Sequence, residues 1–218
     1  MKLDPEEVNC YRLMMIFPNL GFMGIPLVRS LYGEESVIFV AFYIVGYNLL
    51  VYSYGILLAM GAGDGEKKGL PVKKLCNIGM GACIVAILIF ALHIKVPEIA
   101  GSFIDSMGNA AVPLSMMTVG IMVAQSELRA LVTDKKQLLF SFISLLVIPA
   151  LSIPLLHLLP IDPVSYGIFI LLIAMPVGSV VMMVEKEYGT TDGRISAGSI
   201  ALTSVISVVT IPLVTMLA

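Results

Sequence analysis

The first apolar stretch of the chain is interrupted in its middle by residues that break helices. The run Phe-Pro-Asn-Leu-Gly-Phe-Met-Gly-Ile-Pro contains Asn19, Gly21, Gly24 and Pro26, and an apolar stretch near the far end contains Pro176 and Gly178. A proline costs about 3 kcal/mol and a glycine about 1 kcal/mol in a helix interior. At membrane depth, the backbone groups freed by such breaks must be satisfied by neighbouring segments. Broken helices at corresponding positions of two halves are typical of a substrate site at the bilayer midplane.

The composition is that of an integral membrane protein. Of 218 residues, 58% are hydrophobic and 13% charged, and the mean hydropathy is +0.99, whereas soluble domains have about 45–50% apolar and about 25% charged residues. A lipid core about 30 Å thick requires about 20 apolar residues per helix. The sequence therefore predicts an all-α protein with one membrane domain over residues 1–218, surrounded by the lipid bilayer, with seven spans at 8–28, 36–60, 75–94, 100–124, 137–158, 164–184 and 195–217.

Several classes of site and partner are disfavoured. The three cysteines, Cys10, Cys76 and Cys83, form no CxxC motif and accompany no histidine cluster, so neither a disulfide framework nor a metal site is predicted. No cofactor is predicted. A net charge of −2 without a basic patch gives no sign of nucleic-acid binding. The acidic, polar start of the chain lacks the features of a signal peptide.

Positive charges predict the orientation in the membrane. The N-terminal tail through Arg12 and the loops after the second, fourth and sixth predicted spans carry eleven Lys and Arg residues, whereas the other side carries two, Arg29 and Lys95. Because Lys and Arg are enriched in cytoplasmic loops, we expect a cytoplasmic N-terminus and an outer C-terminus in the plasma membrane. This arrangement requires an odd number of spans.

A weak internal repeat relates the two interrupted stretches. Shifting the chain by 156 residues places Val28, Tyr32, Gly33 and Ala41 on Val184, Tyr188, Gly189 and Ala197. The copies are five spans apart and therefore cross the membrane in opposite directions, as in the inverted repeats of secondary transporters. Residues 75–217 then form a complete repeat and residues 8–60 only part of one. We therefore expect an N-terminally truncated bundle, whose uncovered interface faces lipid or pairs with a second copy as a homodimer.

The motifs of the chain resemble those of the auxin efflux carrier family of membrane transporters, which is grouped with bile-acid-type and arsenite-type carriers. They are Asn19-Leu-Gly-Phe-Met-Gly-Ile-Pro26 with Leu31-Tyr-Gly33, Gly108-Asn-Ala-Ala-Val-Pro113 with Val119-Gly120, Met175-Pro176 with Tyr188-Gly189, and Thr203 to Pro212. The resemblance implies ten helices in two inverted five-helix repeats, of which the fourth and ninth are broken and cross. On that template, the seven predicted spans look like helices four to ten.

The resemblance also implies a substrate class and a site. Family members are associated with malate and related acids in bacteria and with indole-3-acetate in plants, and both are carboxylates. The first half of the crossing would comprise Asn19, Gly21, Gly24 and Pro26, and the second half Pro176, Gly178 and Ser179. Family members often place an amide side chain in the second broken helix, where this chain has Ser179 followed by two valines.

A helix that starts in mid-membrane attracts an anion without a basic side chain. Its first N–H groups are unpaired, and its dipole adds about half a positive charge there. Asn19 supplies an amide donor and a carbonyl acceptor, so we expect it to contact substrate or cap the broken helix. Glycines permit close backbone approach, and Pro26 and Pro176 are expected to fix the breaks.

Other interpretations remain open. Gly and Pro are common in transmembrane helices and can mark simple kinks, and Asn19 can form an interhelical hydrogen bond worth roughly 0.6–2 kcal/mol. An enzyme is not predicted, because the spans contain no paired acid and no nucleophile with a base. A seven-helix receptor is disfavoured by the predicted cytoplasmic N-terminus and by the absence of lysine from the last span. The remaining alternative to an organic-anion carrier that works by alternating access is a truncated, inactive transporter.

Overall fold

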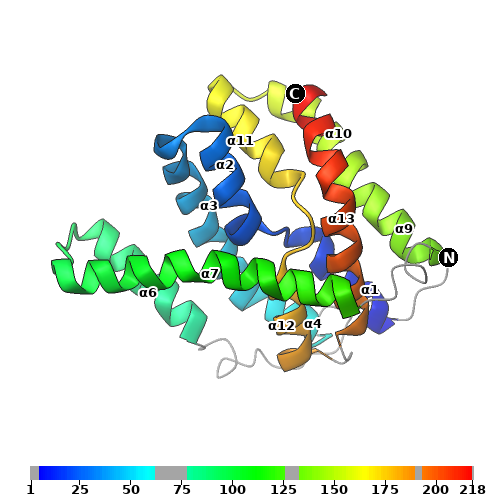
Figure 1. The fold of residues 1–218 in the computed structure, drawn as a ribbon, viewed down its shortest axis with the longest axis horizontal. Coiled ribbons are helices and arrows are strands. Elements are labelled where there is room, and N and C mark those ends of the chain that lie inside the picture. The colour runs from blue at the N-terminus through cyan, green and yellow to red at the C-terminus, as the bar shows by residue number, and fades with distance from the viewer. Residues whose placement is uncertain (1–4, 62–77, 126–132, 190–192, 218) are drawn as a thin grey trace.

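The computed structural model describes residues 5–61, 78–125, 133–189 and 193–217, and these residues are predominantly helical (Figure 1). The α-helices are α1 (Pro5–Ile16), α2 (Ile25–Tyr32), α3 (Val37–Leu50), α4 (Ile56–Ala59), α6 (Ile78–Ala91), α7 (Glu98–Gln125), α9 (Lys135–Phe142), α10 (Ile148–His157), α11 (Pro163–Ile173), α12 (Ser179–Tyr188) and α13 (Arg194–Leu217). Three π-helical turns and a 3₁₀ turn continue some of them: η1 (Leu20–Gly24), η2 (Glu34–Ser36), η3 (Val51–Gly55) and η4 (Ile143–Val147).

Several of these helices are long enough to cross a bilayer. Within the described residues, four continuous helical segments have the required length and apolar character: Glu34–Ala59, Glu98–Ala124, Lys135–His157 and Arg194–Leu217. Shorter apolar helices cover Leu20–Tyr32, Ile78–Ala91 and Pro163–Ile173. The predicted all-α membrane class is therefore supported, and the count of seven spans and the inverted repeat stay predictions.

Both interrupted stretches are broken helices. The first consists of α1, an irregular peptide at residues 17–19, and then η1 and α2, which ends before Gly33. The second consists of α11, an irregular peptide at residues 174–178, and α12, which ends before Gly189. The first break lies earlier than we expected, because it is centred on Pro18. Pro26 instead is the second residue of α2, which directly continues η1, so it lies within the second half of the first broken helix and not at the break.

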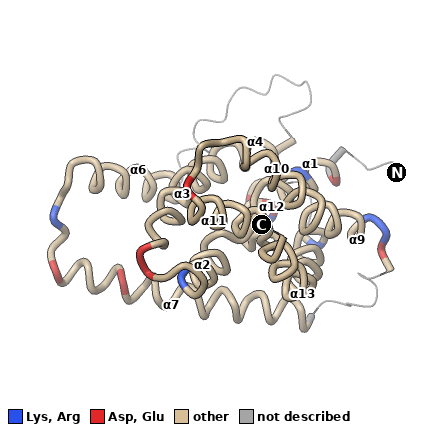
Figure 2. Tube along the Cα trace, turned by 90° about the horizontal axis from the view of Figure 1, so that it is seen from above, with Lys and Arg blue, Asp and Glu red and all other residues tan. Residues whose placement is uncertain are grey.

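Helix α13 is the central helix of the bundle. It contacts α1, α7, α9, α11 and α12, and α7 runs across the front of the bundle in Figure 1. Several of its small polar side chains are buried, among them Ser196, Ser199, Thr203, Ser207 and Thr210, which permits close contact with the neighbouring helices. Helices α6 and α7 extend beyond the rest of the bundle in both Figure 1 and Figure 2.

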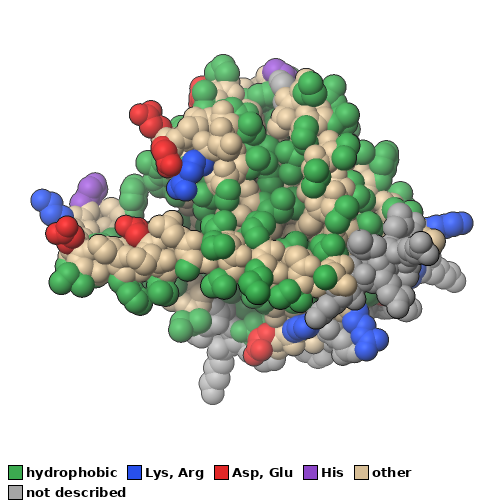
Figure 3. Space-filling model, viewed as in Figure 1, with side chains coloured by type: hydrophobic (Ala, Val, Ile, Leu, Met, Phe, Trp, Pro, Cys, Tyr) green, Lys and Arg blue, Asp and Glu red, His purple; other side chains and the backbone are tan. Residues whose placement is uncertain are grey.

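The surface of the bundle is largely apolar. On the face shown in Figure 3, hydrophobic side chains cover α7 and the helices behind it, and charged side chains gather at the edges. Large hydrophobic side chains such as Ile99, Leu114 and Val208 are exposed by more than half of their surface. An exposed apolar area of this extent is typical of a protein that faces lipid.

Candidate functional site: a crossing of two broken helices

The two breaks meet and pair as short antiparallel segments. The backbone N–H of Asn19 donates to the carbonyl oxygen of Pro176 at 2.7 Å, and the N–H of Gly178 donates to the carbonyl oxygen of Phe17 at 3.0 Å. Pro18 lies opposite Val177 in this pairing. Proline has no N–H, so the donors of the pairing are Asn19, directly after Pro18, and Gly178, two residues after Pro176. The crossing therefore satisfies much of the backbone that the breaks expose.

Neighbouring helices satisfy two further backbone groups of the crossing. The N–H of Val177 donates to Oγ1 of Thr203 on α13 at 3.2 Å, and the hydroxyl of Tyr47 on α3 donates to the carbonyl oxygen of Pro18 at 2.8 Å. Irregular backbone at membrane depth is tolerated only where protein groups or a water-filled cavity replace the lost hydrogen bonds. Thr203 and Tyr47 provide this replacement from two sides.

Gly178 allows the two segments to approach each other closely. A Cβ atom at this position would lie 3.0 Å from the carbonyl oxygens of Phe17 and Pro18 and 3.1 Å from the hydroxyl of Tyr47. Two of these neighbours are backbone atoms, which cannot turn away as a flexible side chain can. A residue without a side chain is therefore required at the closest point of the crossing.

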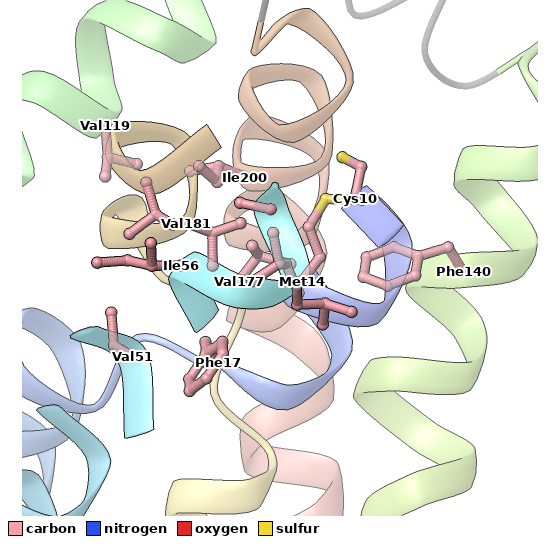
Figure 4. Close-up of a cluster of buried hydrophobic side chains, with 14 residues drawn as sticks. Cys10, Met14, Phe17, Val51, Ile56, Val119, Phe140, Val177, Val181 and Ile200 are labelled. Atoms are coloured by element: carbon pink, nitrogen blue, oxygen red, sulfur yellow. The ribbon is translucent and has the colours of Figure 1, made fainter. Parts of the chain in front are cut away.

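An apolar cluster supports one side of the crossing (Figure 4). Phe17 and Val177 extend from the two breaks into this cluster, where they join Met14 of α1, Val181 of α12 and Ile200 of α13. A second cluster, which contains Leu20, Leu172 and Met175, packs around η1, α2 and α11. Burial of these side chains fixes the positions of the four half-helices that meet at the crossing.

A cavity of about 390 Å³ opens beside the crossing. Its lining comes from both breaks and from η1, α2, α3, η3, α7 and α12: Asn19, Leu20, Gly21, Phe22, Ile25, Ile44, Tyr47, Asn48, Tyr52, Gly108, Ala111, Val112, Gly178, Ser179, Val180 and Met183. None of these lining residues is charged. Most are apolar, with a few amide and hydroxyl side chains, which is the usual character of a small-molecule site.

Asn19 is the most distinctive group in this cavity. The residue is 2% exposed, and its side-chain nitrogen Nδ2 makes no hydrogen bond to any described residue. A buried donor without a partner costs about 1–3 kcal/mol, so buried polar groups usually find one. Asn19 is one of the residues that line the cavity, and a ligand atom that reaches Nδ2 can accept a hydrogen bond from this donor.

The N-terminus of α12 lies at the same place. Gly178 is the residue that precedes this ten-residue helix, and no side chain caps the helix by a hydrogen bond. Gly178, Ser179 and Val180 all line the cavity. The first N–H groups of a helix and its dipole favour a negative charge at this end. The N-terminus of α12 therefore favours an anion at this end of the cavity, although no charged side chain is among the lining residues.

The three π-helical turns found among the described residues adjoin the crossing or a neighbouring cavity. Leu20 and Gly21 of η1 and Tyr52 of η3 line the 390 Å³ cavity, and Ser144 of η4 lines a smaller cavity beside it. Single π turns inside α-helices occur frequently at functional sites. Their positions around the crossing agree with a functional role for this part of the bundle.

The structure brings together four of the seven predicted site residues. Asn19, Gly21, Gly178 and Ser179 line the cavity, whereas Gly24, Pro26 and Pro176 do not. The carbonyl of Pro176 instead accepts the hydrogen bond from the N–H of Asn19, and Pro26 is the second residue of α2.

Gly24 has a packing role. A Cβ atom there would lie 2.9 Å from Cδ2 of Leu172, so this glycine permits close contact between the first broken helix and α11. The expectation that Pro26 fixes the first break was wrong. Pro18 is the proline that lies within this break, where it pairs with Val177.

Sequence reasoning missed the contributions of α3 and α7. Tyr47, Asn48 and Tyr52 line the cavity from α3 and η3, but an aromatic or amide residue within an apolar span carries no signal of its own. Gly108 and Val112 of α7 also line it. Both residues belong to the motif from Gly108 to Pro113, and this motif could have indicated that α7 contributes to the site.

Comparison with known proteins identifies the family. Residues 1–215 match the family described as membrane transport protein. An uncharacterized transporter of Methanothermobacter thermautotrophicus is 27% identical over 197 residues, which cover 89% of this chain and 63% of the relative. An uncharacterized transporter of Methanocaldococcus jannaschii is 23% identical over 215 residues, which cover 97% of this chain and 69% of the relative.

The chain therefore spans about two thirds of the length of these relatives, and less than two thirds of the first. The match extends over both broken helices and over the helices that surround the cavity. The resemblance noted in the sequence is confirmed, and the chain is a multi-pass membrane protein. It belongs to the membrane transport protein family, whose members are transporters and not enzymes.

Proposed function

We propose that the protein is a secondary carrier of small organic anions, with its binding site at the crossing of the two broken helices. The observation that carries this proposal is the buried side-chain amide of Asn19, whose Nδ2 has no partner among the described residues and which lines the cavity. A carboxylate oxygen is an acceptor that matches this donor. Amide donors and a helix N-terminus can bind a carboxylate without a basic side chain. Such a site avoids the free-energy cost of removing a cation from water, which a buried salt bridge incurs.

The remaining lining suits the carbon skeleton of such an anion. Ile25, Ile44, Val112 and Met183 provide apolar surface, and Tyr52 provides an aromatic ring. A volume of about 390 Å³ lies within the range of small-molecule sites, which is about 300–1,000 Å³. The substrates we propose are small carboxylates, either dicarboxylates that resemble malate or aromatic acids that resemble auxin.

Transport would proceed by alternating access around the crossing. The half-helices reach it from opposite sides, so a rocking motion of the surrounding helices exposes the same site first to one side of the membrane and then to the other. We propose a cytoplasmic N-terminus, an outer C-terminus and a location in the plasma membrane. The long exposed faces of α6 and α7 leave room for lipid or for a second copy of the chain in a homodimer.

Counterflow in proteoliposomes tests this function. Vesicles that contain the protein and are loaded with an unlabelled carboxylate should accumulate the labelled form from outside, with malate and indole-3-acetate as the two probes. Vesicles without protein, and loading with a neutral sugar, are the controls. Accumulation of either acid above both controls supports the carrier. Equal signals in all vesicles for both acids would contradict it and favour the alternative of an inactive transporter.

A further inference from the structure

A second cavity lies next to the first. It has a volume of about 200 Å³ and is lined by residues of α1, the first break, η1, α3, η4, α10 and α11, among them Tyr43, Ser144 and Ser152. Two residues, Leu20 and Tyr47, line both cavities. The side chain of Tyr47 therefore lies between the two spaces, at the point where the broken helices cross.

Tyr47 contacts both halves of the crossing. Its hydroxyl donates to the carbonyl oxygen of Pro18 at 2.8 Å, and its ring packs edge-to-face on Phe17 with centroids 5.5 Å apart. On the other segment, the same hydroxyl lies 3.1 Å from the position that a Cβ atom on Gly178 would occupy. One side chain of α3 thus touches both breaks.

The hydroxyl of Tyr47 donates a hydrogen bond to the peptide unit that joins Pro18 to Asn19. The carbonyl of Pro18 and the N–H of Asn19 belong to one planar peptide unit. Its carbonyl accepts from Tyr47 at 2.8 Å and from the N–H of Leu20 at 2.9 Å, and its N–H donates to Pro176 at 2.7 Å. Because the unit is held at both ends, the direction in which Cα of Asn19 projects its side chain is fixed.

We propose that Tyr47 is a positioning residue for the anion site: it holds the Pro18–Asn19 peptide so that the amide of Asn19 faces the larger cavity. This inference rests on the proposed function, since it assigns Tyr47 to the same site. The ring has a separate effect, because it fills the space between the two cavities. Tyr47→Phe keeps the ring and removes only the hydroxyl, so it isolates the hydrogen bond to Pro18.

The first experiment measures the peptide directly and needs no ligand. Hydrogen exchange of the purified full chain, followed by mass spectrometry, is compared between the wild type, Tyr47→Phe and Tyr43→Phe. Tyr43 is the matched control, because it lies one helical turn earlier, lines only the smaller cavity and packs on Phe169. We expect faster exchange in Tyr47→Phe in peptides that contain Asn19 or Gly178, and no change in Tyr43→Phe. Unchanged exchange in both variants would overturn the inference.

The second experiment measures affinity for the carboxylate that the wild type binds best. Pro18 keeps one of its two donors in Tyr47→Phe, so we expect a dissociation constant about tenfold higher, against less than twofold in Tyr43→Phe. A purely structural role would lower the melting temperature and leave the affinity unchanged, which would contradict a positioning role. Absence of carboxylate binding by the wild type would refute the proposed function, and the exchange experiment would still decide whether Tyr47 holds the peptide.

Discussion

The backbone N–H of Asn19 lies 2.7 Å from the carbonyl oxygen of Pro176, and this hydrogen bond joins two broken helices from opposite ends of the chain. The paired segment places the side chain of Asn19 and the N-terminus of α12 at one cavity. Both features favour a negative charge. The anion site that we propose is therefore a consequence of how the two breaks pair with each other.

The close approach at Gly178 predicts a strong effect of a single methyl group. Gly178→Ala places a Cβ atom 3.0 Å from two backbone carbonyl oxygens, and we expect it to lower the free energy of unfolding by roughly 1–3 kcal/mol, as overpacking does. Gly46→Ala is the control, because nothing lies within 4 Å of its Cβ position. Unfolding in a detergent titration measures both. Equal stability of the two variants would show that the crossing is looser than described.

The hydroxyl of Thr203 predicts a second effect on stability. It accepts from the N–H of Val177 at 3.2 Å and donates to the carbonyl of Ser199 at 2.6 Å. Thr203→Val leaves the N–H of Val177 without this acceptor, so we expect a loss of about 1–3 kcal/mol. Thr215→Val is the control, since its hydroxyl bonds only within α13. A loss no greater than in the control would remove Thr203 from the support of the crossing.

A pH effect is expected at the start of α11. The backbone N–H of Ser165 donates to the carboxylate of Asp162 at 2.9 Å, which lowers the pKa of that carboxyl below its usual value of 3.8. A lowered folded-state pKa means that the stabilisation is complete above the unfolded value and is lost as pH falls through the folded one. We therefore expect the melting temperatures of wild type and Asp162→Ala to differ at pH 6 and to converge as the pH falls below 3.8. A difference that stays constant with pH would contradict a charged cap.

The predicted orientation can be tested with single cysteines. In a background in which Cys10, Cys76 and Cys83 are replaced by alanine, we expect Lys186→Cys to react with an impermeant thiol reagent only from the cytoplasmic side. Lys95→Cys should react only from outside, because the loops with few positive charges lie there. The reagent is applied to intact cells and to inverted vesicles. The opposite pattern would reverse the topology.

The sequence predicted the presence of two broken helices better than the exact position of each break. Helix-breaking residues around Asn19 and Pro176 correctly indicated two interrupted helices, because glycine and proline affect local backbone energies that do not depend on the fold. The predicted position of the first break was wrong. The break lies at Pro18, which pairs with Val177 of the second break, and not at the later glycines or Pro26.

The surroundings of the site were harder to predict. Tyr47 is one of several aromatic residues in the largely apolar helix α3, and neither it nor the neighbouring Asn48 forms a motif. Their roles depend on which face of α3 meets the crossing, and that is set by packing among segments distant in sequence. The same holds for α7, whose contact with α13 places Gly108 and Val112 at the cavity.

The most direct test of the anion site is the affinity of the purified full chain for a panel of small carboxylates, measured by titration calorimetry for the wild type, Asn19→Ala and Asn109→Ala. Asn109 is an exposed asparagine of α7 outside the cavity lining. We predict that Asn19→Ala weakens binding at least tenfold, because it removes the free donor, while its melting temperature stays within a few degrees of the wild type and Asn109→Ala binds normally. Undiminished binding by Asn19→Ala would contradict the assignment of the site to the crossing.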